Sequence, residues 1–248
     1  MIKKIQNSPR SYAWGSSELL VDLGYPETGE PLAEVWFGTH PLSQATDGET
    51  GQALSESIGH PLDFMLKFLA AEMPLSIQVH PDEQQARAGF ERENALGLSI
   101  EDSERTYKDP SAKREAIVAV SPFDLLIGLK SEAEAKHLFE HLSQRLDGAA
   151  SKLAASYASE IASLGLKSCL EHILGGHTDA DQEVLLTEIR NHLSDFNNQI
   201  VDLELLDRLF ELFGNDRGIL VAMVMRRHLL QPGQAVFVDS GVPHCYLS

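Results

Sequence analysis

Helical periodicity fills one continuous block of the sequence, residues 131–216, and short alternating apolar runs lie on either side of it. Inside the block, leucines recur at every fourth position from Leu138 to Leu146, which places their side chains on one face of a helix. Ser131 is followed three residues later by Glu134, and this capping-box pattern favours a helix that starts at the edge of the block. We therefore predict that the block is helical.

Other capping residues mark where further helices begin. Thr178 or Asp179 is the predicted N-cap of one later helix, and Asp202 is the predicted N-cap of another. Before the block, Asp82 follows a proline and is predicted to cap a helix that runs to about Ala95.

The flanking stretches, residues 1–130 and 217–248, are punctuated by Gly and Pro and contain the two-residue alternation of β-strands. The clearest case is Leu75–His80, in which apolar and polar residues alternate strictly. Shorter runs of this kind are Glu115–Val120, Leu125–Leu129, Ile219–Met225 and Ala235–Val238. The economical interpretation is a mainly β domain, built from both flanks and interrupted by a helical insertion over residues 131–216.

The charge of the chain restricts its partners. The sequence has 20 Lys and Arg residues against 37 Asp and Glu residues, and the resulting net charge of −17 repels nucleic acid phosphates. The longest apolar stretch, Ile219–Met225, is far shorter than the ~20 residues that span a bilayer. The start of the chain lacks the apolar core of a signal peptide, and its two cysteines argue against a disulfide scaffold. We expect a soluble, cytoplasmic protein that binds neither nucleic acid nor membranes.

Gln78 and His80 give the most informative local indication of chemistry. Residues two apart on a strand point to the same side, with Cα atoms ~6.6 Å apart, so both side chains can approach one ion. Histidine is the commonest protein metal ligand, and the amide oxygen of Gln can serve as a further one. The alternative is a solvated strand face on which both residues are merely exposed, and the pair alone favours that alternative.

Two further ligand candidates lie elsewhere in the chain. Glu115 stands at the head of an apolar run, and His244 follows a proline turn. With Gln78 and His80 they form a set of two nitrogens and two oxygens that zinc accepts, although the spacing is equally compatible with four unrelated residues. Cys245 is a conceivable fifth ligand, but it alternates with His244 along the chain and is predicted to be a small buried residue.

Other catalytic motifs are absent from the sequence. It has neither a GxSxG nucleophile elbow nor a GxxxxGK[ST] or GxGxxG phosphate loop. The histidines in the helical block and at its exit are predicted to be ordinary surface or boundary residues: His137, His141, His172, His177, His192 and His228.

Five short blocks occur along the sequence in a fixed order. They are Tyr12–Ser16 (YAWGS), Ala33–Pro41 (AEVWFGTHP), Leu75–Asp82 (LSIQVHPD), Tyr107–Pro110 (YKDP) with Lys113 and Glu115, and Pro243–Leu247 (PHCYL). In this order the blocks resemble the type I phosphomannose isomerases, and SIQVHPD is highly specific.

This resemblance implies a zinc-dependent isomerase that interconverts mannose 6-phosphate and fructose 6-phosphate through a cis-enediol, with zinc as Lewis acid and orienting template. It also implies a cupin-like jelly roll with an inserted helical domain. The family's zinc ligands fall on Gln78, His80, Glu115 and His244. The family residues around the sugar phosphate fall on Lys67, Ser76, Lys113 and Tyr246, with Trp14 as a candidate for the pocket wall. The general acid/base is not identified by the sequence.

The resemblance covers the whole sequence but corresponds to the N-terminal part of a typical family member. Such members continue with further cupin strands and a segment that carries a catalytic arginine, and the 248 residues contain no such segment. We therefore expect weak isomerase activity, and the alternative hypothesis is a non-catalytic cupin fragment that binds zinc and sugar phosphate. Strands without neighbours also leave an open sheet edge, which favours self-association.

Overall fold

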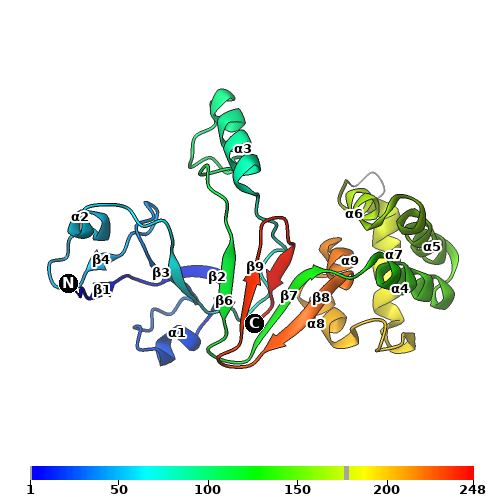
Figure 1. Ribbon diagram of the computed structural model, residues 1–248. Coiled ribbons are helices and arrows are strands. Elements are labelled where there is room, and N and C mark those ends of the chain that lie inside the picture. Colours follow the sequence, from blue (N-terminus) through cyan, green and yellow to red (C-terminus); the bar gives the residue numbers. More distant parts are fainter. Residues whose placement is uncertain (1, 176–178) are drawn as a thin grey trace. The chain divides into compact units, whose positions relative to one another are not determined.

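A computed structural model describes residues 2–175 and 179–248 of the chain (Figure 1). The fold divides into two compact units. The first unit comprises Met1–Ser76, Ser121–Leu125 and Cys245–Ser248, and the second comprises Ile77–Val120 and Leu126–His244. The described residues form four separate β-sheets and no closed barrel. Since long helices accompany these short strands, the chain is a mixed α/β structure.

The first unit is built on a three-stranded antiparallel sheet in the order β2-β3-β5. Its strands are β2 (Arg10–Ser16), β3 (Leu32–Phe37) and β5 (Leu66–Leu69). The smaller elements are β1 (Ile5–Gln6), β4 (Thr46–Asp47), α1 (Leu19–Asp22) and α2 (Leu54–Ile58). The central strand β3 contributes to a hydrophobic core whose members are Leu20, Leu32, Val35 and Ala70.

The remaining strands confirm three of the predicted runs. β6 (Glu115–Val118) and β9 (Ala235–Val238) form a two-stranded antiparallel sheet (Figure 1). β7 (Phe123–Leu129) is the middle strand of a sheet with β10 (His244–Tyr246) and β8 (Met225–Leu230). The apolar alternation of the sequence is therefore a correct guide to strands in these segments.

The predicted strand Leu75–His80 is wrong. Within it, Gln78 alone forms an isolated bridge, with His244, through reciprocal backbone hydrogen bonds of 2.8 and 2.9 Å. Pro74 and Pro81 flank the segment, and a proline has no N–H to extend a ladder of hydrogen bonds. The segment is therefore extended chain that contacts β10 at two places, the Gln78 bridge and a 2.8 Å hydrogen bond from the backbone N–H of Leu75 to the carbonyl oxygen of Tyr246, without forming a regular ladder.

The predicted strand Ile219–Met225 is wrong as well. Most of this run belongs to helix α9 (Gly218–Met223), and β8 begins only at Met225. A short continuous apolar run does not distinguish a buried strand from a buried helix. The residues of α9 after Gly218 are all buried, so both outcomes would produce the same pattern in the sequence.

Helices occupy the predicted block. They are α4 (Glu132–Arg145), α5 (Gly148–Leu164), α6 (Leu166–Gly175), α7 (Asp179–Asn191), the short 3-10 helix η1 (Leu193–Asp195) and α8 (Leu203–Phe213). Ser131 and Glu134 form the predicted capping box, and Asp202 caps α8 as predicted. The cap predicted at Thr178 or Asp179 lies outside the described side chains. Helix α5 packs against α4, α6 and α7 (Figure 1).

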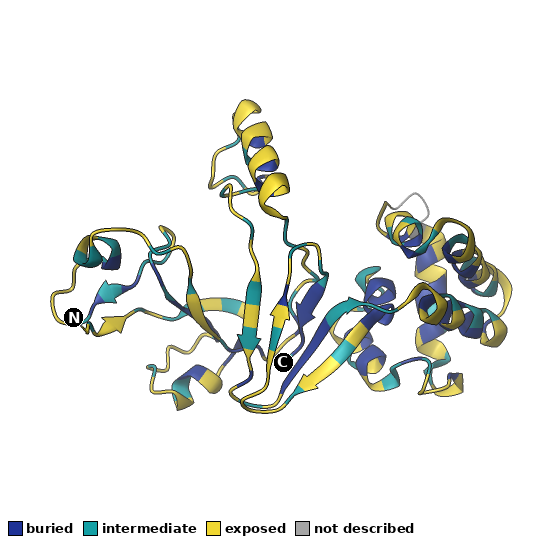
Figure 2. Cartoon of the chain, viewed as in Figure 1, coloured by how far each residue is buried: buried dark blue, intermediate teal, exposed yellow. Residues whose placement is uncertain are grey.

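Helix α3 (Glu83–Ala95) is the helix predicted before the block. The Asp82 side chain accepts a hydrogen bond from the backbone N–H of Gln85, and the side-chain oxygen of Gln85 accepts one from the backbone N–H of Asp82. Much of α3 is exposed (Figure 2). Within the described part of the chain, each helix is too short or too polar to cross a membrane.

Candidate metal site

Three of the side chains predicted to bind metal lie together. Ring nitrogens of His80 and His244 and a carboxylate oxygen of Glu115 all lie within 4.8 Å of one another. His80 Nε2 is 3.1 Å from Glu115 Oε1, and His244 Nε2 is 3.6 Å from Glu115 Oε2. The carboxylate therefore presents one oxygen to each imidazole.

Backbone contacts hold these three residues in place. Glu115 is the first residue of β6, paired with Val238 of β9, and His244 is the first residue of β10. The bridge between Gln78 and His244 fixes the segment that carries His80 two residues later. The backbone N–H of Gly241 also donates to the carbonyl oxygen of His80, at 2.8 Å. Two independent backbone links thus join the His80 segment to His244 and to the turn before it.

The donor set fits a divalent metal such as zinc. Zn–N and Zn–O bonds of ~2.0–2.2 Å at tetrahedral angles put neighbouring ligand atoms about 3.4 Å apart. The two nitrogen–oxygen distances, 3.1 Å to Oε1 and 3.6 Å to Oε2 of Glu115, each lie close to that value. Nδ1 of His244 is 2.9 Å from the carbonyl oxygen of Val242, and an Nδ1–H that donates there leaves the lone pair of Nε2 directed at the site.

The site is anchored on its buried side and open on the other. The side chain of His244 is 2% exposed, that of His80 18% and that of Glu115 35%. A buried imidazole is fixed by its packing, whereas the half-exposed carboxylate leaves access for a ligand from solvent. Metal centres that act on substrates need such an open position.

Gln78, the fourth predicted ligand, is tied to this site through its backbone. Because directly paired residues on antiparallel strands project to the same face, the Gln78 and His244 side chains leave the bridge on the same side. The side chain of Gln78 is exposed. Its position is compatible with a role at the site, and its coordination stays a prediction.

Both lysines predicted to bind phosphate are paired with carboxylates. Lys67, on β5, lies 3.2 Å from a carboxylate oxygen of Glu34 and 4.6 Å from the ring centre of Trp36. Lys113 lies 3.3 Å from Asp109 with half of its side chain exposed. The sequence pattern does not indicate the pairing of Glu34 with Lys67, because the two residues come from neighbouring strands that lie far apart along the chain.

The other predicted substrate residues belong to the first unit. The ring of Trp14 stacks on that of Tyr12, with centroids 5.3 Å apart. Both residues are half-buried and lie on one face of β2, while Ser11 and Ala13 on the opposite face are exposed. Ser76 is exposed, and Tyr246 is buried with its ring centre 5.7 Å from that of Phe123. These placements describe each residue in its own unit, and their role in substrate binding stays a prediction.

Cys245 is buried, as predicted. Its thiol donates a hydrogen bond of 2.9 Å to the carbonyl oxygen of Leu75. Burial raises the pKa of the Cys245 thiol to about 12, which keeps it protonated near neutral pH. A zinc ligand would have to be a thiolate, so this environment favours a structural thiol.

The histidines of the helical block have structural surroundings. Nε2 of His141 accepts the backbone N–H of Asn197, and His172 and His192 pair with acidic side chains of their own region. Among residues 2–175 and 179–248, the only group of His, Cys, Asp and Glu residues placed to share a metal is the one at Glu115. His177 lies outside the described residues.

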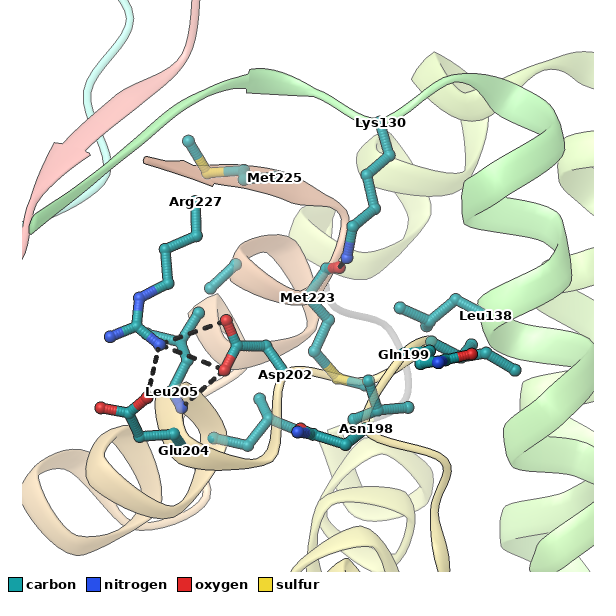
Figure 3. A pocket seen from close by; sticks show the side chains of 14 residues that line it. Lys130, Leu138, Asn198, Gln199, Asp202, Glu204, Leu205, Met223, Met225 and Arg227 are labelled. Carbon is teal, nitrogen blue, oxygen red and sulfur yellow. Dashed lines mark hydrogen bonds and ion pairs between the residues drawn. The ribbon is translucent and has the colours of Figure 1, made fainter. Parts of the chain in front are cut away.

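A pocket of about 370 Å³ lies in the second unit, and none of the predicted site residues lines it (Figure 3). Its charged groups already contact protein atoms. One guanidinium nitrogen of Arg227 is 3.2 Å from both carboxylate oxygens of Asp202, and Lys130 Nζ donates to the carbonyl oxygen of Met223 at 2.5 Å. Burial lowers the pKa of Lys130. We interpret this pocket as part of the packing of the helices on β8.

Two imidazoles and a carboxylate held on paired backbone segments define the chain as a candidate metalloprotein. The profile of the family described as "Phosphomannose isomerase type I, catalytic domain" matches residues 2–132, more than half of the sequence. The chain belongs to the type I phosphomannose isomerase family.

Individual relatives agree with this assignment. The mannose-6-phosphate isomerase of Escherichia coli (strain K12) is 31% identical, over 99% of this chain and 66% of the relative. That of Homo sapiens is 27% identical, over 96% and 63%. A crystal structure of mannose 6-phosphate isomerase in its zinc-bound form superposes with a TM-score of 0.86 at 26% identity, over 99% of this chain and 66% of that one. The chain thus spans about two thirds of the length of these relatives.

Proposed function

We propose that this chain carries the metal site and sugar-phosphate residues of a zinc-dependent aldose–ketose isomerase that interconverts mannose 6-phosphate and fructose 6-phosphate. The observation that carries the proposal is the convergence of His80, Glu115 and His244, in a chain whose family relatives include a zinc-bound isomerase structure. Each of these three residues also lies in a sequence block that resembles the family.

In this proposal Gln78 completes the ligand set. The bound zinc would act as a Lewis acid towards the substrate oxygens and lower the barrier to proton transfer between C1 and C2 through a cis-enediol. The two imidazoles hold the metal as neutral ligands, and Glu115 supplies the negative charge of the set. The hydrogen bond from His244 Nδ1 to Val242 orients that imidazole toward the shared position.

The sugar phosphate would be held by the predicted substrate residues. Lys67 and Lys113 supply the positive charges that a phosphate dianion needs, and Ser76 and Tyr246 supply hydroxyl groups. Trp14 offers an aromatic face against which a sugar ring can pack. The residue that moves the proton is not assigned.

We also propose the finer architecture implied by the resemblance. Residues 1–130 and 217–248 would belong to a cupin-like jelly roll, of which this chain holds the N-terminal part, and residues 131–216 would form its helical insertion domain. The two-stranded sheet of β6 and β9 would then present an open edge for self-association. Its outward residues Val118 and Phe237 are 60% and 62% exposed, and light scattering over a range of protein concentrations would detect the association.

Turnover and zinc content measured on the same sample test the proposed function. The zinc-loaded protein is incubated with mannose 6-phosphate, and fructose 6-phosphate is followed in a coupled assay. Activity that disappears with a chelator and returns with zinc supports the isomerase. Zinc and sugar phosphate bound without turnover would favour the alternative, a non-catalytic binding module. Absence of zinc binding would refute both.

A further inference from the structure

Glu34 is a buried carboxylate in the middle of the sheet β2-β3-β5. Its side chain is 9% exposed, and it lies on the central strand β3. Its two oxygens have different partners: Oε2 accepts the indole N–H of Trp36 at 2.8 Å, and Oε1 lies 3.2 Å from Lys67 Nζ. Trp36 and Lys67 are directly paired across β3 and β5, so the three side chains occupy one face of the sheet.

The chemistry of these contacts requires a carboxylate at this position. The indole nitrogen and the ammonium group are both donors and neither can accept a hydrogen bond. A carboxylate offers an acceptor oxygen to each, whereas the amide of Gln has a single acceptor oxygen and a donor group in place of the other. Because the indole N–H fixes one oxygen of Glu34, the other is held toward Lys67.

Lys67 is held but still reaches solvent. Its ammonium group lies beside Glu34 and 4.6 Å from the ring centre of Trp36, and 35% of its side chain is exposed. A free lysine on a surface samples many rotamers, and ordering it on binding an anion reduces affinity. In this cluster Glu34 and Trp36 already contact the ammonium group before any ligand arrives.

We propose that Glu34 is a positioning residue that holds Lys67 in the conformation that receives the phosphate of the sugar. The inference rests on the proposed function, because it assumes that Lys67 is a phosphate-binding residue. Glu34 itself does not touch the ligand. Its buried charge repels a phosphate dianion, but its side chain is only 9% exposed against 35% for Lys67, so the ammonium group is the more accessible charge to an incoming anion. Since immobilising one long side chain costs about 0.5–1.5 kcal/mol, preorganisation of Lys67 is worth about two- to tenfold in affinity.

The test is a double-mutant cycle read by ligand affinity. Calorimetry on the zinc-loaded protein gives the Kd of mannose 6-phosphate for the wild type, Glu34→Gln, Lys67→Met and the double variant, with mannose as the unphosphorylated comparison. Glu56→Gln is the matched control, because it removes one exposed negative charge of the same unit at a distance in sequence from both residues. Thermal unfolding of each variant shows whether it is folded.

We expect Glu34→Gln to raise the Kd of mannose 6-phosphate about two- to tenfold in the wild-type background, and to leave it unchanged or lower it in the Lys67→Met background, where only the repulsive charge of Glu34 is removed. An equal loss in both backgrounds would mean a structural role and would overturn the inference. So would an unchanged Kd for Glu34→Gln while Lys67→Met weakens binding. If Lys67→Met itself leaves the Kd unchanged, Lys67 is not a phosphate residue, and that part of the proposed function falls first.

A second variant covers the case in which Glu34→Gln does not fold. Glu34→Asp keeps the charge, but its side chain is shorter by one methylene and can satisfy only one of the two donors. It is expected to weaken binding of mannose 6-phosphate by a similar factor, again only while Lys67 is present. Unchanged affinity in a folded Glu34→Asp would also overturn the inference.

Discussion

Glu115→Ala is the cleanest perturbation of the candidate metal site. Its carboxylate faces both imidazoles, at 3.1 and 3.6 Å, so its loss removes a group that contacts each of them. Its side chain is 35% exposed, and truncation therefore leaves no buried cavity. The equivalent truncation of His244, which is 2% exposed, would disturb packing and metal binding together.

The expected loss follows from the number of ligands. Structural zinc sites bind zinc with a free energy of ~10–16 kcal/mol, which is about 3 kcal/mol for each of four ligands. Loss of one ligand is therefore expected to raise the zinc Kd about 100-fold. At free zinc 100 times the wild-type Kd, binding stabilises the wild type by about 2.7 kcal/mol and the variant by about 0.4 kcal/mol. For a chain of this size, about 2–4 °C in Tm per kcal/mol gives a difference in zinc-dependent Tm of roughly 5–9 °C.

Two measurements check this prediction. Competition with a chromophoric chelator gives the zinc Kd, and thermal unfolding with and without zinc gives the shift in Tm. Glu101→Ala is the control, because it removes an exposed carboxylate of the same unit that lies outside the group. A zinc Kd for Glu115→Ala within threefold of the wild type would refute the reasoning, and so would the same loss in Glu101→Ala.

Three further outcomes are expected. Burial raises the pKa of Cys169 and Cys245 to about 12, so neither thiol should react with a disulfide reagent at pH 8 until the protein is unfolded. The stability that these raised pKa values contribute is present below the thiol's usual pKa of ~8.5 and is lost as the pH rises toward 12. Tyr157 is fully buried and accepts a hydrogen bond from Gln182, so Tyr157→Ala should lower the free energy of unfolding by about 3–5 kcal/mol and Tyr157→Phe by about 1 kcal/mol, as urea titration would show. Asp109→Asn releases Lys113 and should leave the affinity for mannose 6-phosphate unchanged or tighter; weaker binding would contradict this.

Local signals explain which helices could be predicted. The capping boxes of Ser131 with Glu134 and of Asp82 with Gln85 lie within one turn of sequence, and the structure contains both. The failure at Leu75–His80 has the opposite origin. Whether that segment forms a ladder of hydrogen bonds depends on its partner, which includes His244 near the other end of the chain, and on the prolines beside it. The alternation of apolar and polar residues within the segment gives no information on either.

The metal site could be predicted in part because its chemistry limits the residue types. Two histidines and a carboxylate are the expected zinc ligands, and the sequence blocks single out which of the ten histidines to choose. Glu34 could not be found in this way. Its meaning depends on the register of β3 against β5, which places Lys67 opposite Trp36 and within reach of the carboxylate. Such a pairing is a property of the sheet and has no local signature.

A chain with a net charge of −17 can still recognise a phosphate dianion, because the charges that matter lie within a few ångströms of it. Fields from exposed charges beyond ~8 Å are screened at physiological salt. The two candidate lysines meet this condition differently. The pair of Lys113 with Asp109 has side chains 50% and 34% exposed and is worth about 0–1 kcal/mol, so a phosphate competes with it easily. The partner of Lys67 is buried, is also bonded to Trp36 and cannot follow the ammonium group away from the sheet. In the proposed site Lys113 would therefore exchange its carboxylate for the phosphate, whereas Lys67 would keep Glu34 and share its remaining N–H groups with the ligand.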